Sequence, residues 1–554
     1  MPSSTAGFVA DPDVLIVGAG PTGLTLAAQL QAFGVRFRIV DRLEDRARES
    51  RALAVQARSL ELLQTLGLGE ALAARGNPSA RLVLHLDGRP VAEVTLGAIG
   101  ATDTRFPFIL FVSQAETEAL LLDHLAAAGV TVERGVELAS AEPGADDVRC
   151  VLRHGDGRDE RVRAKFLVGC DGAHSTVRRM AGIPFEGGSY PQQFVLGDVE
   201  ADGPLAPDAI NSFAGRGVAM FFPLGRPTTW RVIAMSETDP QRAESDGPAV
   251  GDLTLADLQT IVDAPTGGTV RVRDPAWLSR FRLHHRQTSH YRAGRLFLAG
   301  DAAHVHSPVG AQGMNTGIQD AWNLGWKLAL VARGSADARL LDTYEAERWP
   351  VGRFLVRYTD RVFSSFTRAM SSSVVAGWVR RAIMPAVLPR VFRSRRLRTA
   401  AFRFVSELGI RYRRSPAVTE GEPHLRGGPR AGDRLPDVHV TIDGRAAWLQ
   451  EAVVGPRLTL LLCGDAAAWA PDRLSALRVT YPQLLALRFL TRSAVAGALV
   501  DEGGDALTRL GVRDAAQYLV RPDGHVAFRC RGRELAALER YLGAWYVSST
   551  RGSA

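Results

Sequence analysis

Val14-Leu-Ile-Val-Gly-Ala-Gly-Pro-Thr-Gly23 is the stretch of the chain that decides its fold. Its apolar start predicts a short buried strand, and its glycines predict a tight loop. Leu24 to Phe33 follows with the apolar spacing of a helix, which Gly34 ends. Arg36 to Val40 predicts a second strand, with Asp41 at its end. Strand, glycine loop, helix and strand in this order form the βαβ unit of a dinucleotide-binding α/β fold.

The three glycines of the loop each meet a different requirement of phosphate binding. Gly18 permits the tight turn, Gly20 lets the backbone approach a pyrophosphate, and Gly23 lets the helix pack closely on the strand. The phosphates then lie at the helix N-terminus, next to free N–H groups and the positive end of the helix dipole. The carboxylate of Asp41 is placed to accept hydrogen bonds from a ribose diol.

Two further strands run directly into a pair of glycine and aspartate. Phe166 to Gly169 leads to Asp171-Gly172, where a helix follows. Arg295 to Ala299 leads to Gly300-Asp301, and a glycine-rich turn from Pro308 to Gly317 runs into the next helix. The backbone N–H groups of such a turn can cradle an anionic ring edge.

These three motifs give the chain a family resemblance. From about Asp13 to Arg353 it resembles the class A flavoprotein monooxygenases, the para-hydroxybenzoate hydroxylase type. The resemblance implies an α/β fold in which a Rossmann-like FAD-binding domain carries an inserted β-sheet substrate domain and a helical segment. It also implies non-covalently bound FAD, with NADPH or NADH as co-substrate. A flavin that swings between two positions accounts for the lack of a second strand, glycine loop and helix for the nicotinamide nucleotide.

The resemblance carries the family's FAD contacts onto matching positions of this chain. The glycine loop matches the diphosphate site, and Asp41 matches the contact to the adenosine ribose. Asp171-Gly172 matches a motif that serves FAD and is also implicated in nicotinamide binding, and Asp301 matches the contact to the ribityl chain. The cofactor residues implied in this way are Gly18, Ala19, Gly20, Pro21, Thr22, Gly23, Asp41, Arg42, Arg51, Gln114, Asp171, Gly172, Gly300, Asp301, Pro308, Gly310, Gly313, Met314 and Asn315.

The chain changes character after about residue 425. Gly432 to Asp437 and Leu519 to Arg529 resemble the thioredoxin-like C-terminal domain of phenol and aromatic-polyketide hydroxylases. The four cysteines form no C-x-x-C pair, so thiol–disulfide chemistry is not expected. The expected role is structural, either packing on the FAD domain or a subunit contact, which leaves a homodimer open.

The predicted domain organisation interleaves two domains and adds a third. The FAD-binding domain comprises 1–80, 111–185 and, with the helical segment, 286–425. The substrate domain comprises strands in 81–110 and a β-sheet in 186–285, and the thioredoxin-like C-terminal domain comprises 426–554.

The substrate is expected to lie on the strands between Phe194 and Met235, above the flavin. Large aromatic and apolar side chains suit a planar ligand, because ring stacking adds to the burial of apolar area. The alternative for each of them is a place in the core of the sheet. The candidates are Phe213, Met220, Phe221, Phe222 and Trp230.

No catalytic base is assigned from the sequence. His304 and His306 follow Asp301, where a turn brings them near the flavin site. His304 fits the family's motif and is interpreted as a structural hydrogen-bonding residue. His306 is a candidate for proton transfer, because a histidine titrates near neutral pH.

The reaction is implied by the resemblance. In the family, NAD(P)H reduces FAD, O2 adds to the reduced flavin, and the flavin hydroperoxide transfers an oxygen atom. The implied substrate is a polycyclic aromatic natural product, phenolic or of the polyketide type, as in antibiotic biosynthesis. Two alternatives remain open: a Baeyer–Villiger or ring-cleaving oxygenation on the same fold, and a flavoprotein that binds a pathway intermediate without oxygenating it.

Composition excludes several other classes of protein. No apolar run is long enough for a membrane helix, and the first residues show no secretory pattern. The net charge of +8 is dilute over 554 residues and no nucleic-acid motif is present, so no nucleic acid is expected as a partner. The cysteines have no zinc spacing, so no metal is expected, and they indicate a reducing, cytoplasmic location.

Overall fold

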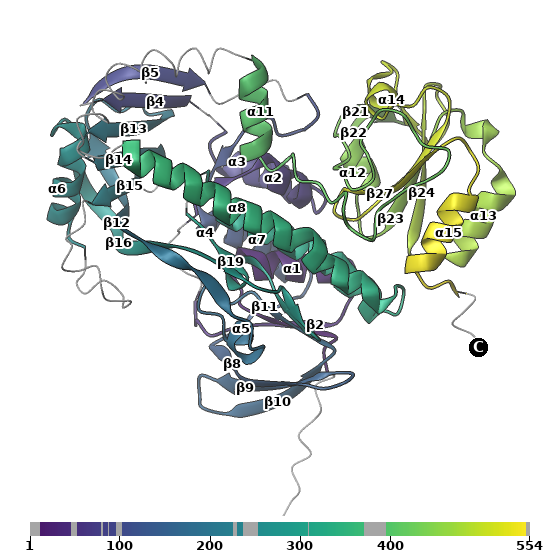
Figure 1. The fold of residues 1–554 in the computed structure, drawn as a ribbon, viewed down its shortest axis with the longest axis horizontal. Helices are drawn as coiled ribbons and strands as arrows, with labels where there is room; N and C mark the ends of the chain where they lie inside the picture. Colours follow the sequence, from purple (N-terminus) through teal and green to yellow (C-terminus); the bar gives the residue numbers. More distant parts are fainter. Residues whose placement is uncertain are drawn as a thin grey trace, which may run out of the picture.

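The computed structural model describes residues 11–45, 52–78, 81–86, 88–95, 102–215, 217–224, 230–236, 253–307, 310–369 and 395–549. Arg51 and Pro308, two of the predicted cofactor residues, lie outside these ranges. Figure 1 shows three groups of elements, with the long helix α8 (Asp342–Ala369) crossing between them. The fold is of the mixed α/β kind.

The central sheet is built around the predicted βαβ unit. Its strand order is β17 (Arg292–Ala293), β18 (Leu296–Leu298), β11 (Phe166–Gly169), β1 (Val14–Val17), β2 (Phe37–Asp41) and β7 (Glu133–Arg134). β17 is antiparallel to its neighbour, and the other strands run parallel. Since β1, β11 and β18 are each followed by one of the three motifs, the parallel pairing brings all three motifs to the same edge of the sheet.

Helices cover one face of the central sheet, and a small antiparallel sheet covers the other (Figure 1). The helices are α1 (Pro21–Ala32), α4 (Gln114–Ala127) and α7 (Gly313–Ala332), and the small sheet is β8 (Val136–Pro143), β9 (Val148–His154) and β10 (Asp159–Ala164). Arg38 of β2 joins the two sheets, because its guanidinium donates to Glu133 at 2.6 Å and to Glu160 of β10 at 2.8 Å. Both faces of β1 are therefore shielded from solvent, in keeping with its purely apolar sequence.

Short elements connect these layers. They are β3 (Ala54–Val55), α2 (Ala57–Gln64), α3 (Leu68–Arg75), β6 (Leu110–Phe111), α5 (Thr176–Met180), η2 (Gly300–Ala302) and η3 (Ala338–Leu341). β3 and β6 pair with each other as a two-stranded sheet.

An eight-stranded sheet, which we call the insert sheet, lies beside the central unit. Its strand order is β19 (His304–Val305), β16 (Arg271–Thr288), β12 (Phe185–Asp202), β15 (Trp230–Ser236), β14 (Gly217–Pro223), β13 (Ala209–Gly215), β4 (Arg81–Leu86) and β5 (Arg89–Thr95). One face of the sheet is covered by α6 (Leu255–Thr266), which contacts β13, β14, β15 and β16. β4 and β5, far away in sequence, complete the sheet through the parallel pairing of β4 with β13.

The C-terminal sheet has the strand order β20 (Thr419–Glu420), β27 (Val526–Arg531), β26 (Ala516–Val520), β23 (Leu458–Cys463), β24 (Leu485–Thr491), β25 (Leu499–Val500), β21 (His439–Ile442) and β22 (Arg445–Trp448). β23 and β24 are parallel, and β26 is antiparallel to both of its neighbours. The helices of this part are α12 (Leu449–Val453), α13 (Pro471–Thr480), α14 (Asp505–Arg509) and α15 (Ala536–Trp545).

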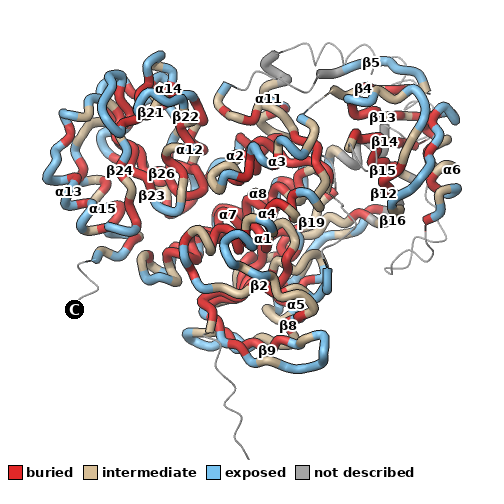
Figure 2. The backbone as a smooth tube through the Cα atoms, turned by 180° about the vertical axis from the view of Figure 1, so that it is seen from behind, coloured by how far each residue is buried: buried red, intermediate tan, exposed pale blue. Residues whose placement is uncertain are grey.

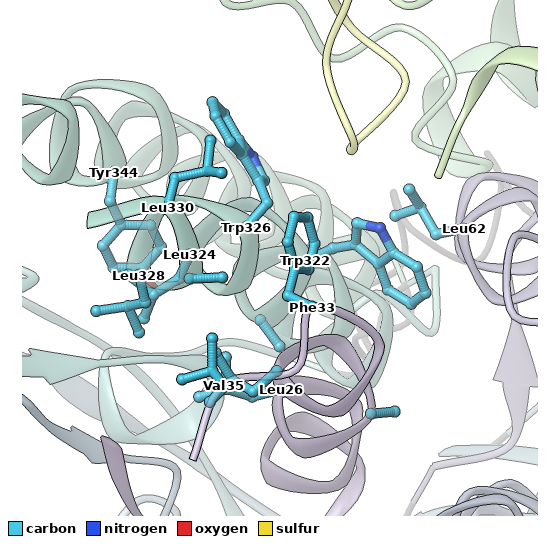
Figure 3. Packing of buried hydrophobic residues seen from close by; sticks show 14 of the residues in the cluster. Leu26, Phe33, Val35, Leu62, Trp322, Leu324, Trp326, Leu328, Leu330 and Tyr344 are labelled. Atoms are coloured by element: carbon cyan, nitrogen blue, oxygen red, sulfur yellow. The ribbon is translucent and has the colours of Figure 1, made fainter. Parts of the chain in front are cut away.

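One apolar cluster runs from the central sheet through α7 into the C-terminal sheet. Trp322 and Trp326 of α7 are fully buried, and Figure 3 shows them in one cluster with Leu26, Phe33 and Tyr344. The same cluster includes apolar side chains of β23 and β27. Figure 2 shows buried stretches on both sides of this junction, whereas α13 and α15, on the far side of the C-terminal sheet, carry exposed residues. The C-terminal sheet therefore shares a core with the rest of the chain.

Helix α11 (Arg395–Val405) is followed by a buried carboxyl group that ties this segment to α7. Glu407 is 2% exposed, and burial raises the pKa of its carboxyl to about 8. It accepts from the amide of Gln319 and lies 3.1 Å from the hydroxyl of Thr316, which also lies 2.9 Å from the carbonyl of Gln312. A neutral carboxylic acid satisfies this arrangement, because its O–H can donate to the Thr316 oxygen while that hydroxyl donates to Gln312.

Glu407→Gln is expected to remove a pH-dependent loss of stability. The folded pKa of about 8 lies above the ordinary 4.5, so the folded protein holds a proton that the unfolded chain releases between these values. Burying the protonated carboxyl therefore contributes its full stabilisation below the unfolded pKa of 4.5. This stabilisation is lost as the pH rises through the folded pKa of about 8. The free energy of unfolding of Glu407→Gln, relative to the natural protein, should increase by about 1.4 kcal/mol per pH unit in this window.

Urea unfolding at a series of pH values measures this difference. Exposed Glu137 provides the matched control, because its replacement by Gln neutralises a carboxylate that is not buried. A difference for Glu407→Gln that stays constant with pH would contradict the interpretation.

Candidate active site

Of the three motif glycines at the junction of β1 and α1, one has free space where a side chain would lie and the other two have none. Gly18 has φ +103°, and a Cβ added there would lie 2.3 Å from the carbonyl oxygen of Cys170. A Cβ at Gly23 would lie 1.9 Å from the carbonyl oxygen of Gly18. At Gly20, by contrast, an added Cβ meets nothing within 4 Å, so the backbone at the start of α1 is open to a ligand. Ala19 lies in the same loop, and Pro21 and Thr22 are the first residues of α1. Thr22 also reaches the Gly300 turn described below.

Asp41 lies at the end of β2, directly beside the glycine loop. Its Oδ2 accepts from the backbone N–H of Ala19 at 2.7 Å, and its Oδ1 accepts from Leu43 at 2.9 Å. Arg134 approaches to 3.8 Å, and the neighbouring surface has a depression of about 350 Å³ lined in part by Val130 and Arg134. Arg42, the next residue, is exposed. Asp41 is thus fixed beside the glycine loop, and Arg134 lies between it and the depression.

The Asp171-Gly172 turn follows β11 and begins α5. Asp171 Oδ2 accepts from the backbone N–H groups of Thr176 and Val177 at 2.6 and 3.2 Å. Its Oδ1 is buried and has no hydrogen-bond partner among the described residues, as expected for an atom left available to a ligand. Arg178 of α5 donates to the carbonyl of Ala302 at 2.9 Å, so this turn is tied to the Gly300-Asp301 turn.

The Gly300-Asp301 turn packs tightly against the glycine loop. Gly300 has φ +62°, and a Cβ there would lie 2.5 Å from Thr22 Oγ1. A Cβ at Gly317 of α7 would lie 2.4 Å from the same hydroxyl. Asp301 is exposed at the edge of this contact. The structure thus brings the predicted residues of the first and third motifs together at Thr22.

The turn before α7 is held by Gln56, a residue that no sequence motif indicates. Asn315 Oδ1 accepts from the backbone N–H of Gln56 at 2.8 Å, and its Nδ2 donates to the carbonyl of Ala54 at 2.9 Å. The side chain of Gln56 donates to the carbonyl of Gly310 at 2.9 Å. Gly313 and Met314 begin α7 beside them and are partly buried. Only the long-range contact reveals Gln56, since it lies 259 residues from Asn315 and carries no local signal.

The segment before β3 is held from two sides. Gln114 Oε1 accepts from the N–H of Ala52 at 3.3 Å, and buried Arg231 of the insert sheet donates to the carbonyl of Ala52 at 3.2 Å. Arg231 also pairs with Asp198 at 2.6 and 2.7 Å, and Trp277 donates to the same carboxylate. An arginine within an apolar strand is the only sequence signal of this contact.

The two histidines after Asp301 differ in their surroundings. His304 Nε2 lies 2.6 Å from Asp320 Oδ2, and both side chains are buried. His306 is half-buried, lies 3.9 Å from the position of a Cβ at Gly313, and donates from Nδ1 to the carbonyl of Ser307 at 3.0 Å. Its Nε2 has no partner among the described residues, and desolvation lowers the pKa of the ring to about 4. His306 is therefore a neutral ring near the predicted flavin turn.

The five candidate substrate residues lie on two opposite faces of the insert sheet. Phe213 and Phe221 are fully buried and Trp230 is 3% exposed, all in the cluster packed under α6. Met220 and Phe222 point to the other face, because side chains alternate along β14. They belong to a cluster with Leu53, Phe111, Ile210, Ile233 and Ala311. Since Ala311 belongs to the turn before α7, this second face meets the predicted flavin turn.

Two further classes of site find no support in the described part of the chain. Its histidine, cysteine, aspartate and glutamate side chains form no cluster of three or more that could hold a metal ion. Its helices include none that is both long and apolar enough to cross a bilayer.

Comparison with known proteins identifies the family. Residues 11–359 match the family model described as "FAD binding domain", and residues 428–548 match "Aromatic-ring hydroxylase, C-terminal". The chain belongs to the FAD-dependent aromatic monooxygenases. The resemblance found in the sequence motifs is thereby confirmed.

Individual relatives of this monooxygenase cover nearly its whole length. It is 38% identical over 541 residues to the 6-methylpretetramide 4-monooxygenase of Streptomyces rimosus, covering 97% of this chain and 94% of that protein. The solved anhydrotetracycline hydroxylase of Streptomyces rimosus is 30% identical with a TM-score of 0.72, covering 97% of this chain and 99% of that one. The Diels–Alderase of pyrroindomycin biosynthesis, PyrE3, is 29% identical with a TM-score of 0.69, covering 96% and 99% of the two chains.

Gly20→Ala and Gly23→Ala are expected to separate ligand approach from folding in the monooxygenase. Gly20 has an ordinary φ of −79° and open space, so Gly20→Ala should change the free energy of unfolding of the FAD-free protein by less than about 1 kcal/mol. Its methyl group should nevertheless weaken FAD binding at least tenfold, because it occupies the open side of the loop. Gly23→Ala meets backbone and should destabilise the fold by roughly 3 kcal/mol or more.

Urea unfolding of the FAD-free variants and titration with FAD measure the two effects. Equal FAD affinity of Gly20→Ala and the natural protein would show that the open position does not face the cofactor.

Proposed function

We propose that this monooxygenase hydroxylates a polycyclic aromatic natural product, phenolic or of the polyketide type, with FAD, NAD(P)H and O2. The observation that carries the proposal is the apolar face of Met220, Phe222 and Ile233, which meets the turn at Ala311. Such a face favours a flat apolar ligand close to a flavin ring. The relatives that act on 6-methylpretetramide and anhydrotetracycline support the same substrate class.

We propose that the three motif turns hold FAD non-covalently. The open backbone at Gly20 fits a pyrophosphate, fixed Asp41 fits a ribose, and the orphaned Oδ1 of Asp171 offers a further acceptor. Exposed Asp301 and the turn at Gly310 are proposed for the ribityl chain and the ring. When bound, FAD would take a hydride from the nicotinamide nucleotide and activate O2 for transfer of one oxygen atom to the substrate.

The chain's own contribution is to bind, orient and exclude water. The apolar face would orient the ring system of the substrate and exclude water from the site. The contacts of Asn315 would fix the turn before α7 next to this face. His306 is neutral and its free Nε2 is an acceptor, so we propose that it receives a hydrogen bond rather than acting as an acid. We leave Phe213, Phe221 and Trp230 out of the proposed substrate site, because they pack under α6.

We also propose the interleaved domain organisation, with the C-terminal domain as a thioredoxin-like scaffold. Its four central strands have the order β27, β26, β23, β24 with β26 antiparallel, which matches the thioredoxin topology. β20 joins this sheet, so the domain would begin nearer residue 419 than 426. All four cysteines are free, which supports a structural role and a reducing, cytoplasmic location.

Two alternatives share this site. A Baeyer–Villiger or ring-cleaving oxygenation would use the same apolar face with a different substrate pose. The second alternative is a flavoprotein that does not oxygenate its ligand. One observation supports it: the similar protein PyrE3 is named a Diels–Alderase.

Aerobic turnover of the FAD-loaded protein with NADPH or NADH, ¹⁸O₂ and a panel of polycyclic phenols tests the proposal. One labelled oxygen atom in a product is the expected result, and NMR then distinguishes a hydroxyl from a lactone. Absence of label together with no acceleration of NAD(P)H oxidation by any phenol would favour the non-oxygenating alternative.

Met220→Ala and Phe221→Leu form a matched pair on the two faces of β14. Met220→Ala is expected to raise the KM of the aromatic substrate at least fivefold without changing FAD affinity, because it removes apolar contact on the face that meets the turn at Ala311. Phe221→Leu is expected to lower stability by about 1 to 2 kcal/mol without changing KM, since Phe221 packs under α6. Steady-state kinetics and urea unfolding measure both effects, and a KM change in Phe221→Leu alone would reverse the assignment of faces.

A further inference from the structure

The junction between the C-terminal sheet and helices α7 and α8 contains a group of fully buried charges. Glu347 of α8 accepts a hydrogen bond from Lys327 of α7 at 2.8 Å. Its two carboxylate oxygens also accept from the two terminal nitrogens of Arg521, each at 2.7 Å. Arg521 also pairs with Asp523, to which its Nε donates at 3.0 Å. The side chains of these four residues are at most 4% exposed. Two cations and two anions thus balance one another away from water.

A second buried group lies next to the first on α8. Arg348 donates to Asp320 of α7 at 2.6 Å, to the carbonyl of Thr316 at 3.1 Å and to the hydroxyl of Tyr412 at 3.0 Å. Asp320 in turn accepts from the N–H of Gly300 at 3.1 Å. Arg348 therefore reaches the backbone of the Gly300-Asp301 turn through a single carboxylate.

The two groups are coupled through the helix and through Tyr412. Glu347 and Arg348 are consecutive residues, so α8 cannot shift one without the other. The Arg521 guanidinium lies 5.3 Å from the centre of the Tyr412 ring, whose hydroxyl bonds Arg348. Lys327 and Asp320 are seven residues apart on α7, which places them on one face of that helix. The C-terminal sheet is thus linked to the predicted cofactor turn through a series of buried side-chain contacts.

We propose that Arg521 is a positioning residue for the FAD site: by holding Glu347, and with it Arg348, it fixes Asp320 and the Gly300-Asp301 turn. This inference rests on the FAD site proposed above. It gives the C-terminal domain a role in cofactor binding, beyond that of an added structural layer.

The test compares two double variants that each remove one buried arginine and one aspartate paired with it. Arg521→Met with Asp523→Asn removes the contact to α8 and keeps the buried charge balanced. Arg434→Met with Asp103→Asn is the matched control, because Arg434 also crosses the junction but pairs with Glu61 of α2 at 3.2 Å and with Asp103 at 2.9 Å. Each protein is stripped of FAD and titrated with FAD, and flavin fluorescence and the visible absorption spectrum are recorded.

The expected result is an FAD dissociation constant at least tenfold higher for the Arg521 double variant, with an altered spectrum of the bound flavin. The control should stay within twofold of the natural protein. Equal weakening in both variants, or none in the Arg521 variant, would overturn the proposal. FAD binding by the natural protein is measured first, and its absence would overturn the proposed FAD site itself.

Arg521→Lys keeps the inference falsifiable if the double variant does not fold. Lysine retains the charge but cannot bond both oxygens of Glu347 side by side, so an FAD affinity between those of the natural protein and the double variant is expected. An unchanged affinity and spectrum in Arg521→Lys would overturn the proposal.

Discussion

The carboxylate of Asp320 is the constraint on which the geometry of the site depends. It is completely buried, and desolvation opposes its charge, yet the adjacent Arg348 and His304 hold its pKa below the usual value. A buried charge is tolerated only where every partner is in place. Its Oδ1 accepts a hydrogen bond from Arg348. Its Oδ2 accepts from the backbone N–H of Gly300 and lies within hydrogen-bond distance of His304. The position of α8, the start of α7 and the turn after β18 are therefore set together.

Local sequence was sufficient for the parts of the site that obey local rules. The turn at Gly18 and the contact at Gly23 require glycine for steric reasons that act within a few residues, so the motif alone predicts them. Parallel strands then carry Asp171 and Gly300 to the same edge of the sheet as this loop. Contacts across the fold have no such signal. Gln56 carries no local signal, and Arg231 stands out only as an arginine within an apolar strand. Tertiary structure shows that Arg231 and Gln56 hold the two ends of the segment from Ala52 to Gln56.

In the insert sheet, the alternation of side chains predicts which residues share a face but not which face is buried. Alternation along β14 divides Phe221 from Phe222, but it does not reveal which face α6 covers. That choice depends on a helix some forty residues downstream. The Arg521-Pro-Asp-Gly524 segment gives a similar lesson. Its turn between two strands follows from the sequence, whereas the burial of its charges follows from the approach of α8.

The apolar cluster shared by α7 and the C-terminal sheet has a consequence for engineering by recombination. A chimera that exchanged the C-terminal domain between related enzymes would cut through one core and one set of compensated charges. Lys327 and Glu347 would have to travel with Arg521 and Asp523, although nearly two hundred residues separate the two pairs. Breakpoints that look natural in the linear sequence are thus unfavourable in this protein, and its parts are expected to have diversified as one inherited unit.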